Sequence, residues 1–319
     1  MIRFTLDGFR NPPKQVRPMV RWWWSGLDVH RDELLSEVRD MDDAGFGGAE
    51  VQAFMIGSPT NLAKIDRARY QRSHRFMQPY YYEMVEAVLK EAASRGFTID
   101  LTICSAWPAG GVHVTPEGSL KTLLMGTKVL RGPGVYRGAL PRYDKPYSYR
   151  IPKQVPLLGA IETFDRSHIR PSRVVAAKPL DKPGRVRSFR PKTALLDIGT
   201  ARDITDCVSA EGQLEWEIPE GTWQVFAIYA GSAGTHPLFD ARQEPDATSH
   251  VLDHYSASAV KELLDLHLGR GKEHFGEHFG RTLRAFFTDS LELAAEWAWT
   301  DAFLAEFQRR RGYDLTAYL

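Results

Sequence analysis

Hydrophobic and polar positions in the first third of the chain follow two alternating periods. Short apolar runs at 17–24, 46–54 and 97–104 are bounded by Gly, Pro or Ser, which is typical of β-strands. Between them, residues 30–45 and 79–96 carry apolar side chains at helical spacing, and each of these segments ends on a glycine. Strand, helix, strand, helix, strand with short joints predicts right-handed βαβ units and a parallel sheet.

The first predicted strand contains three consecutive tryptophans, Trp22, Trp23 and Trp24. Because neighbouring residues of a strand face opposite sides, we expect Trp22 and Trp24 on one face and Trp23 on the other. Large side chains on both faces predict a strand that is covered on both sides, as parallel strands are.

The pattern changes between residues 126 and 237, where no helical period is found. Short apolar runs there are bounded by Gly, Pro and Asp. In one of them Leu214, Trp216 and Ile218 alternate with polar residues, which predicts a sheet with one face in water. This segment is therefore predicted to be an all-β module inserted after the third strand.

Helical periodicity returns at 256–269, and a fourth strand at 283–290 is followed by a helical pattern at 293–312. Four strand–helix units are half of an eightfold barrel. The predicted fold class is therefore α/β, the first half of a (β/α)₈ barrel with an inserted all-β module. An open four-stranded parallel sheet is the alternative, which the alternation of faces does not separate from a half barrel.

This organisation predicts three parts. They are residues 1–125 for the first three barrel units, 126–237 for the inserted module, and 238–319 for the fourth unit and its helix, where the chain ends mid-barrel.

Charge and composition narrow the classes of partner. The chain of 319 residues has 41 Lys and Arg against 40 Asp and Glu, so it lacks the basic excess expected of a nucleic-acid-binding protein. No apolar stretch is long enough for a membrane span, and residues 1–18 lack the apolar core of a signal peptide. Cys104 and Cys207 stand far apart, which argues against a disulfide framework or a cysteine metal site. The oligomeric state is left open.

Candidate chemistry lies where the predicted parallel strands end, because active sites of such folds form at the C-terminal strand ends. Indole rings stack on the C–H faces of sugars, and carboxylates bind hydroxyls, hold a hard cation or act as acid and base. Asp289 and Glu292 also have the spacing of a helix capping box, which is the alternative role for this pair. The candidate residues are Trp24, Glu50, Gln52, Trp107, Asp289 and Glu292.

Five segments in this order resemble the N-terminal part of glycoside hydrolase family 106, the α-L-rhamnosidases. They are "RPMVRWWWSG", "DAGFGGAEVQAF", "CSAWPAGGVHVTPE", "LRAFFTDSLELAAEWAWT" and "RRRGYDLTAYL". The resemblance implies a (β/α)₈ catalytic barrel and hydrolysis of terminal α-L-rhamnosides with inversion of configuration. It also implies a Ca²⁺ ion associated with the active site, for which no ligands are assigned here. Members of this family are longer than this chain and are commonly exported.

The resemblance places the family's acid and base carboxylates beyond this sequence, so no catalytic pair is assigned. The six candidates are expected to form the sugar-binding half of the site, with a carbohydrate as the partner. An inverting pair needs carboxyl groups about 6.5–9.5 Å apart, and Glu50 and Glu292 are the candidates within this chain. Two other functions stay open: a non-catalytic carbohydrate-binding protein, and an intact hydrolase of another sugar that uses Glu50 and Glu292.

Overall fold

The chain forms two compact units, each of which is described by itself. The computed structural model describes residues 5–55, 64, 66–105, 107–142, 171–180, 196–233, 237, 249–293, 295 and 297–316. The first unit takes the described residues of 5–119 and 237–293, and the second takes those of 120–142, 171–233 and 295–316. Residues 295–316 therefore group with the β-rich module, whereas the sequence pattern assigns them to the fourth strand–helix unit.

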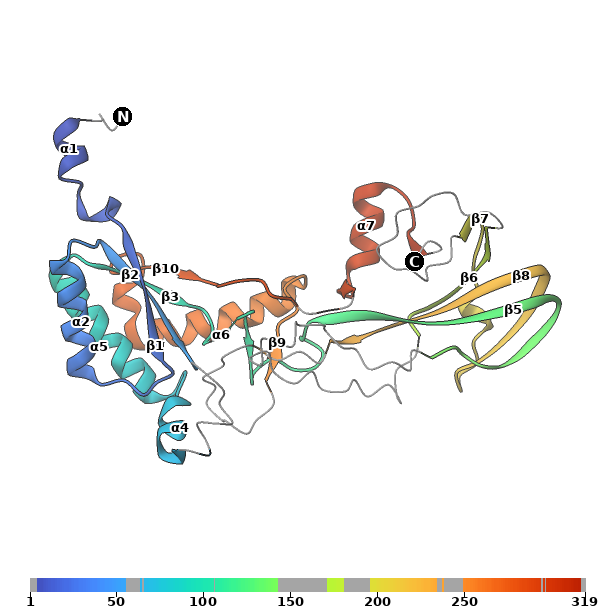
Figure 1. The fold of residues 1–319 in the computed structure, drawn as a ribbon, viewed down its shortest axis with the longest axis horizontal. Coiled ribbons are helices and arrows are strands. Elements are labelled where there is room, and N and C mark those ends of the chain that lie inside the picture. Colours follow the sequence, from blue (N-terminus) through green and yellow to red (C-terminus); the bar gives the residue numbers. More distant parts are fainter. Residues whose placement is uncertain are drawn as a thin grey trace. The chain divides into compact units, whose positions relative to one another are not determined.

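The first unit contains a four-stranded parallel sheet in the order β1-β2-β3-β10 (Figure 1). Its strands are β1 (Met19–Ser25), β2 (Gly48–Phe54), β3 (Thr98–Thr102) and β10 (Leu283–Phe287). These strands lie where the sequence predicts them, and the parallel pairing is confirmed. Among the described residues, β1 pairs with β2 alone, so β1 is an edge strand.

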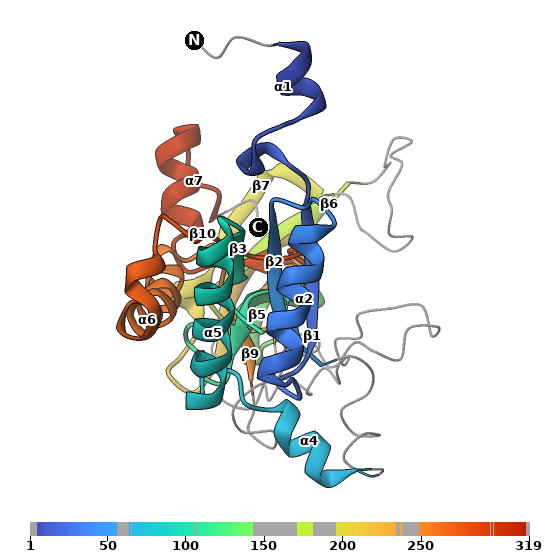
Figure 2. The ribbon, with the colours of Figure 1, turned by 90° about the vertical axis from the view of Figure 1, so that its left-hand side faces the viewer.

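Three helices cover one face of this sheet, and Figure 2 shows two of them, α2 and α5, side by side over β1, β2 and β3. They are α2 (Arg31–Asp43), α5 (Pro79–Arg95) and α6 (Ala257–Phe275). Apolar side chains from this face and from the helices form the main core, including Trp22, Trp24, Leu34, Val38, Val51, Met84, Val88, Ile99, Leu101, Phe275 and Leu283. The opposite face carries polar and charged residues.

Short elements complete the first unit. They are α1 (Leu6–Arg10), a 3₁₀ turn (Lys14–Val16), α4 (Arg67–Ser73), β4 (Gly110–Gly111), β9 (His250–Val251) and a second 3₁₀ turn (Gly276–His278). Helix α4 lies between the predicted strand 46–54 and the predicted helix 79–96, where the sequence analysis places no element. It is only seven residues long and begins where Asp66 accepts a hydrogen bond from the Arg69 amide at 2.9 Å, a local cap that supports a single short helix.

The second unit is an antiparallel sheet in the order β11-β5-β8-β6-β7. Its strands are β5 (Lys121–Ala139), β6 (Arg173–Pro179), β7 (Leu196–Asp203), β8 (Gln213–Ser232) and β11 (Ala298–Trp299), and a 3₁₀ turn lies at Thr205–Cys207. Leu214, Trp216 and Ile218 are buried while the residues between them are not, so the predicted alternation is confirmed. The Trp216 ring packs edge-on against Trp223 in the module's own core.

The last helix is shorter than the sequence predicts. Helix α7 (Phe303–Arg311) replaces only the second half of the predicted helix 293–312. Before it, β11 pairs with β5, and the Leu123 amide donates to the Trp297 carbonyl. Burial of Trp299 in the module favours this pairing over a continued helix. Across the described part of the chain, no helix combines the length and the apolar character that crossing a membrane requires.

A glycine directly after β1 is needed for the chain to turn there. Gly26 has a φ of 58°, and a Cβ at this position would lie 2.6 Å from the Ser73 carbonyl oxygen. We expect Gly26→Ala to lower the free energy of unfolding by about 3 kcal/mol, because a strained left-handed conformation is combined with a backbone overlap. Chemical denaturation of the chain measures this loss.

The matched control is Gly45→Ala at the end of α2. Gly45 also has a positive φ, 92°, but a Cβ added there would have no atom within 4 Å outside its own chain neighbours. Only the conformational strain applies, so a loss of about 1 kcal/mol is expected. Equal losses for the two substitutions would contradict the role of the Ser73 contact.

Candidate functional site

The candidate site is the face of the parallel sheet opposite the helices, called here the polar face. Strand register brings Arg21, Glu50 and Asp100 next to one another across β1, β2 and β3. The same register pairs Trp23 with Gln52. Because side chains of paired residues point to the same side of a sheet, these five residues share one face.

A charge network crosses the polar face. The Arg21 guanidinium lies 3.2 Å from Glu50 Oε2 and 2.9 Å from Asp289 Oδ2. Arg21 belongs to β1 and Asp289 follows β10, and these two strands form the opposite edges of the sheet. Their contact therefore connects β1 with the segment after β10 across the polar face.

A second ion pair lies deeper on this face. Arg284 reaches Asp100 with two hydrogen bonds, from Nε at 3.1 Å and from Nη2 at 2.5 Å. The Asp100 side chain is 5% exposed, whereas that of Arg284 is 52% exposed. The hydrogen bond to Asp100 raises the pKa of Arg284, so this guanidinium stays charged.

Aromatic rings form a wall at the C-terminal end of the sheet. Trp23 is 50% exposed, and its ring packs edge-on against Phe54, with centroids 5.0 Å apart. Phe54 in turn contacts Trp107 at 5.4 Å. Trp23, Phe54 and Trp107 come from β1, β2 and the segment after β3, so three successive strand ends supply one aromatic surface. A half-exposed indole held by neighbouring rings presents a flat apolar plate to a ligand.

Gln52 lies on the same face beneath this surface. It is fully buried, and neither its amide oxygen nor its amide nitrogen has a hydrogen-bond partner among the described residues. A buried amide without partners is costly and points to an occupant that supplies them, such as a water or a ligand.

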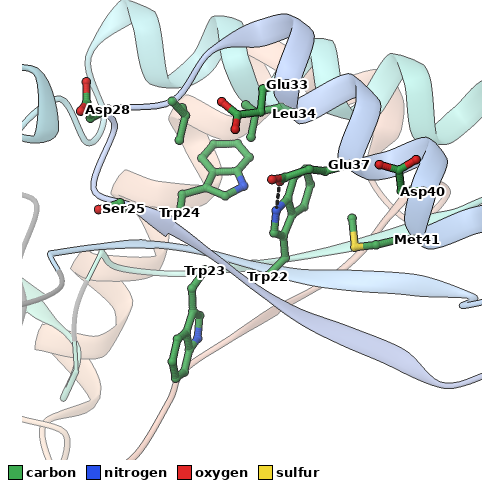
Figure 3. A pocket seen from close by; sticks show the side chains of 11 residues that line it. Trp22, Trp23, Trp24, Ser25, Asp28, Glu33, Leu34, Glu37, Asp40 and Met41 are labelled. Atoms are coloured by element: carbon green, nitrogen blue, oxygen red, sulfur yellow. Dashed lines mark hydrogen bonds between the residues drawn. The ribbon is translucent and has the colours of Figure 1, made fainter. Parts of the chain in front are cut away.

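The tryptophan that faces the site is not the one expected from the sequence. Trp24, a candidate for substrate binding, is 2% exposed and lies in the core under the helices, beside Trp22. Figure 3 shows Trp22 and Trp24 pointing toward α2 and Trp23 pointing to the other side of β1. Trp23 was missed as a candidate, although the period-two alternation places it on the face of Glu50 and Gln52 once the register is known.

The remaining candidates divide into two groups. Glu50, Gln52 and Asp289 lie on the polar face, and Trp107 joins its aromatic wall. Glu292 is exposed in the segment after β10, and among the described residues no contact connects it with the other five. Asp289 does not cap a helix, because the next described helix begins at Phe303; its Oδ1 atom accepts a hydrogen bond from the Ser290 amide instead.

The calcium ion implied by the resemblance has no ready-made cluster of carboxylates on the described part of the polar face. No three His, Cys, Asp or Glu side chains there are close enough together to hold a metal ion. Glu50, Asp100 and Asp289 are each engaged by an arginine, which competes with a cation for the same oxygens. The calcium ion implied by the resemblance stays a prediction, and no chemical step is derived through it.

Comparison with known proteins relates most of the chain to a single enzyme family. The family model described as alpha-L-rhamnosidase, of glycoside hydrolase family 106, matches residues 10–154 and 182–319. A solved structure of a rhamnosidase from Novosphingobium sp. PP1Y superposes with a TM-score of 0.61 at 18% identity, covering 98% of this chain and 42% of that one. The likeness shows a shared fold.

A curated relative from Formosa agariphila carries a different name. The chain is 22% identical over 329 residues to a protein named "Putative beta-glucuronidase", covering 98% of this chain. The chain spans 26% of that relative's length. The relative therefore contains far more sequence than the part that is matched here.

Proposed function

The chain belongs to glycoside hydrolase family 106, and from this premise we propose that it supplies the sugar-binding part of an enzyme that hydrolyses terminal α-L-rhamnosides with inversion. The half-barrel architecture predicted from the sequence is part of this proposal. It is supported by the parallel order of the four strands and by the Arg21–Asp289 contact, which connects β1 with the segment after β10 across the polar face.

The observation that carries the proposal is the combination of a half-exposed indole with fixed carboxylates on one face. Trp23 offers an apolar plate for the C–H face of a pyranose ring. Arg21 engages only the Oε2 atom of Glu50 in the described hydrogen bonds, which leaves Oε1 to accept from a sugar hydroxyl. Arg21 thereby fixes the Glu50 carboxylate beside the plate, which reduces the ordering cost of binding.

Neither Glu50 nor Glu292 is assigned as the general acid. A general acid must deliver a proton to the leaving group, whereas the described contacts of Glu50 engage it with the Arg21 guanidinium. Glu292 lies apart from the polar face contacts. The sugar-binding assignment therefore rests on Trp23, Glu50, Gln52, Trp107 and Asp289, and the acid and base are left unassigned.

A β-glucuronide is the second candidate substrate, suggested by the name of the curated relative. A uronate carboxylate is usually recognised by an arginine or lysine. Both arginines described on the polar face, Arg21 and Arg284, are already engaged by carboxylates. This arrangement favours a neutral sugar such as rhamnose over a uronate.

Titration of the chain with methyl α-L-rhamnoside tests the proposal. We expect binding that quenches or shifts tryptophan fluorescence, and Trp23→Ala should weaken the affinity about tenfold or more, since aromatic–ligand contacts contribute about 1–3 kcal/mol. Trp24→Phe is the matched control on the opposite face and should leave the affinity unchanged. Methyl β-D-glucuronide should bind more weakly than the rhamnoside.

The rate at which the chain hydrolyses a rhamnoside distinguishes a sugar-binding part of an enzyme from an intact hydrolase. The chain alone is expected to hydrolyse an aryl α-L-rhamnoside very slowly, because the resemblance places the acid and base of the family outside this sequence. Hydrolysis at rates typical of complete glycosidases, abolished by Glu50→Gln, would favour an intact hydrolase instead. An affinity for the rhamnoside that Trp23→Ala leaves unchanged would refute the assignment of the polar face.

A further inference from the structure

Phe54 is a buried aromatic residue that lies outside the main core of the first unit. It is the last residue of β2 and is 4% exposed. Alternation along β2 places its side chain on the face of Glu50 and Gln52. Its two chain neighbours, Ala53 and Met55, belong to the apolar cluster under the helices, whereas Phe54 does not. The burial of Phe54 therefore comes from the polar side of the sheet.

Two indoles make ring contacts with Phe54. Trp23 packs edge-on against it with an interplanar angle of 77°, and Trp107 lies on it with a tilt of 51°. Trp23 pairs with Gln52, so Phe54 is its diagonal neighbour on β2. Aromatic side chains reach one another across this diagonal of a sheet. Phe54 thus stands between an indole of β1 and an indole from the segment after β3.

The backbone of Phe54 is anchored where the two strands end. Phe54 pairs with Ser25 in the parallel ladder, and its carbonyl oxygen accepts a hydrogen bond from the Gly26 amide at 2.6 Å. A side chain on a strand of the scaffold is held more precisely than one on a loop. Trp107 also restrains the Phe54 ring from a second direction. The half-exposed Trp23 ring therefore rests against a fixed neighbour.

We propose that Phe54 is a positioning residue, which holds the Trp23 indole in the orientation that a pyranose ring meets. This inference rests on the function proposed above. Phe54 has too little exposed surface to contact the sugar itself, so it acts through Trp23. An indole that is already held loses less rotational freedom when a ligand binds, and such preorganisation raises affinity without adding a contact.

Titration of the 319-residue chain with methyl α-L-rhamnoside tests this role. Phe54→Leu keeps an apolar side chain but removes the ring against which Trp23 packs. We expect the affinity to fall about three- to tenfold, the range that corresponds to one aromatic pair. An affinity that Phe54→Leu leaves unchanged would overturn the proposal.

The matched control is Phe97→Leu, which removes an equally buried ring from the other side of the sheet. Phe97 is 1% exposed and belongs to the cluster under the helices. Both variants should lower the urea midpoint, because each removes part of a buried ring, but Phe97→Leu should leave the affinity for the rhamnoside unchanged. Equal weakening by the two variants would show a general loosening of the unit and would contradict a positioning role.

A double-mutant cycle shows whether Phe54 acts through Trp23. In the Trp23→Ala chain, Phe54→Leu should change the affinity by less than about twofold, because the ring that Phe54 orients is absent and the two effects are coupled. An undiminished effect there would show that Phe54 acts by another route, which again overturns the proposal.

Near-ultraviolet circular dichroism gives a readout without ligand, since it reports the fixed packing of aromatic side chains. Phe54→Leu should remove the part of the tryptophan signal that Trp23→Ala removes, and the double variant should lose no more. A tryptophan signal that Phe54→Leu leaves intact would show that Trp23 does not depend on this ring.

Failure of this inference is distinct from failure of the proposed function. If Trp23→Ala leaves the affinity for the rhamnoside unchanged, the sugar site itself is refuted. If Trp23→Ala weakens binding and Phe54→Leu does not, the sugar site stands and only the positioning role of Phe54 is refuted.

Discussion

Replacing Arg284 by methionine is expected to lower the free energy of unfolding by about 3 kcal/mol, the lower end of the cost of breaking a buried ion pair. Asp100 is 4% exposed, and Arg284 supplies two hydrogen bonds to its carboxylate. Without the guanidinium, a buried carboxylate is left without its cationic partner. Because Arg284 itself is half-exposed, water compensates part of the loss, which is why the lower end applies.

Two further variants separate this effect from a general loss of packing. Arg21→Met removes the other guanidinium of the polar face, but its partners Glu50 and Asp289 have side chains 32% and 15% exposed, so a loss of about 1 kcal/mol or less is expected. The double variant Asp100→Asn, Arg284→Met should recover part of the stability that Arg284→Met loses. Urea unfolding measures all three, and equal losses for the two arginine variants would contradict this account.

The repeating units of the fold were predictable from the sequence because their signals are local. Helix α5 begins with Pro79 and ends at Gly96, which has the positive φ of a helix-terminating glycine, 64°. The strands are short apolar runs between such helices. The spacing of apolar residues and the Gly and Pro residues at the segment ends are therefore enough to locate them. The order β1-β2-β3-β10 then follows from the preference of βαβ units for adjacent parallel strands.

Assigning the correct tryptophan to the site required information that one strand does not contain. Alternation separates Trp23 from Trp22 and Trp24, but both faces of β1 carry indole, so composition does not reveal which face meets the helices. The register with Glu50 and Gln52 decides it. Register depends on contacts between strands, and a sequence pattern read along one strand does not contain them.

The ion pairs of Arg21 with Glu50 and Asp289 could not be predicted from the sequence for a related reason. Arg21 and Asp289 are 268 residues apart in the chain, and they meet because the segment after β10 reaches across the polar face to β1. Local spacing instead suggested that Asp289 and Glu292 cap a helix. That interpretation was wrong, because β11 pairs with β5 in this part of the chain and the helix begins only at Phe303. The helical spacing of apolar residues in the first half of 293–312 is present in the sequence, but strand pairing in the folded chain outweighs it.

Acid is expected to destabilise the first unit through His267, a buried imidazole on α6. Its Nε2 atom lies 3.8 Å from the Cys104 sulfur, and its ring packs edge-on against His113. Burial, followed by repulsion from His113 and Arg270, lowers the pKa of His267 to about 3. Burial and Arg270 also lower the pKa of His113.

The direction of the pH effect follows from these shifts. An unfolded histidine takes up a proton below about pH 6.5, whereas His267 in the folded chain stays neutral until about pH 3. The unfolded state therefore binds more protons in this interval. Stability is fully present above about pH 6.5 and falls by about 1.4 kcal/mol per pH unit for one such group as the pH decreases.

His267→Phe is expected to remove about this much of the slope between about pH 6.5 and 4.5, a window above the usual range of carboxyl titration. Phenylalanine suits the position because the Phe76 ring lies 5.9 Å from the imidazole. His274→Phe on the same helix is the control: this imidazole is exposed and stacks on Tyr82 at 3.9 Å, so the slope should persist. Urea unfolding at several pH values gives the slopes, and a slope that His267→Phe leaves unchanged would show that the buried imidazole is not the group that titrates.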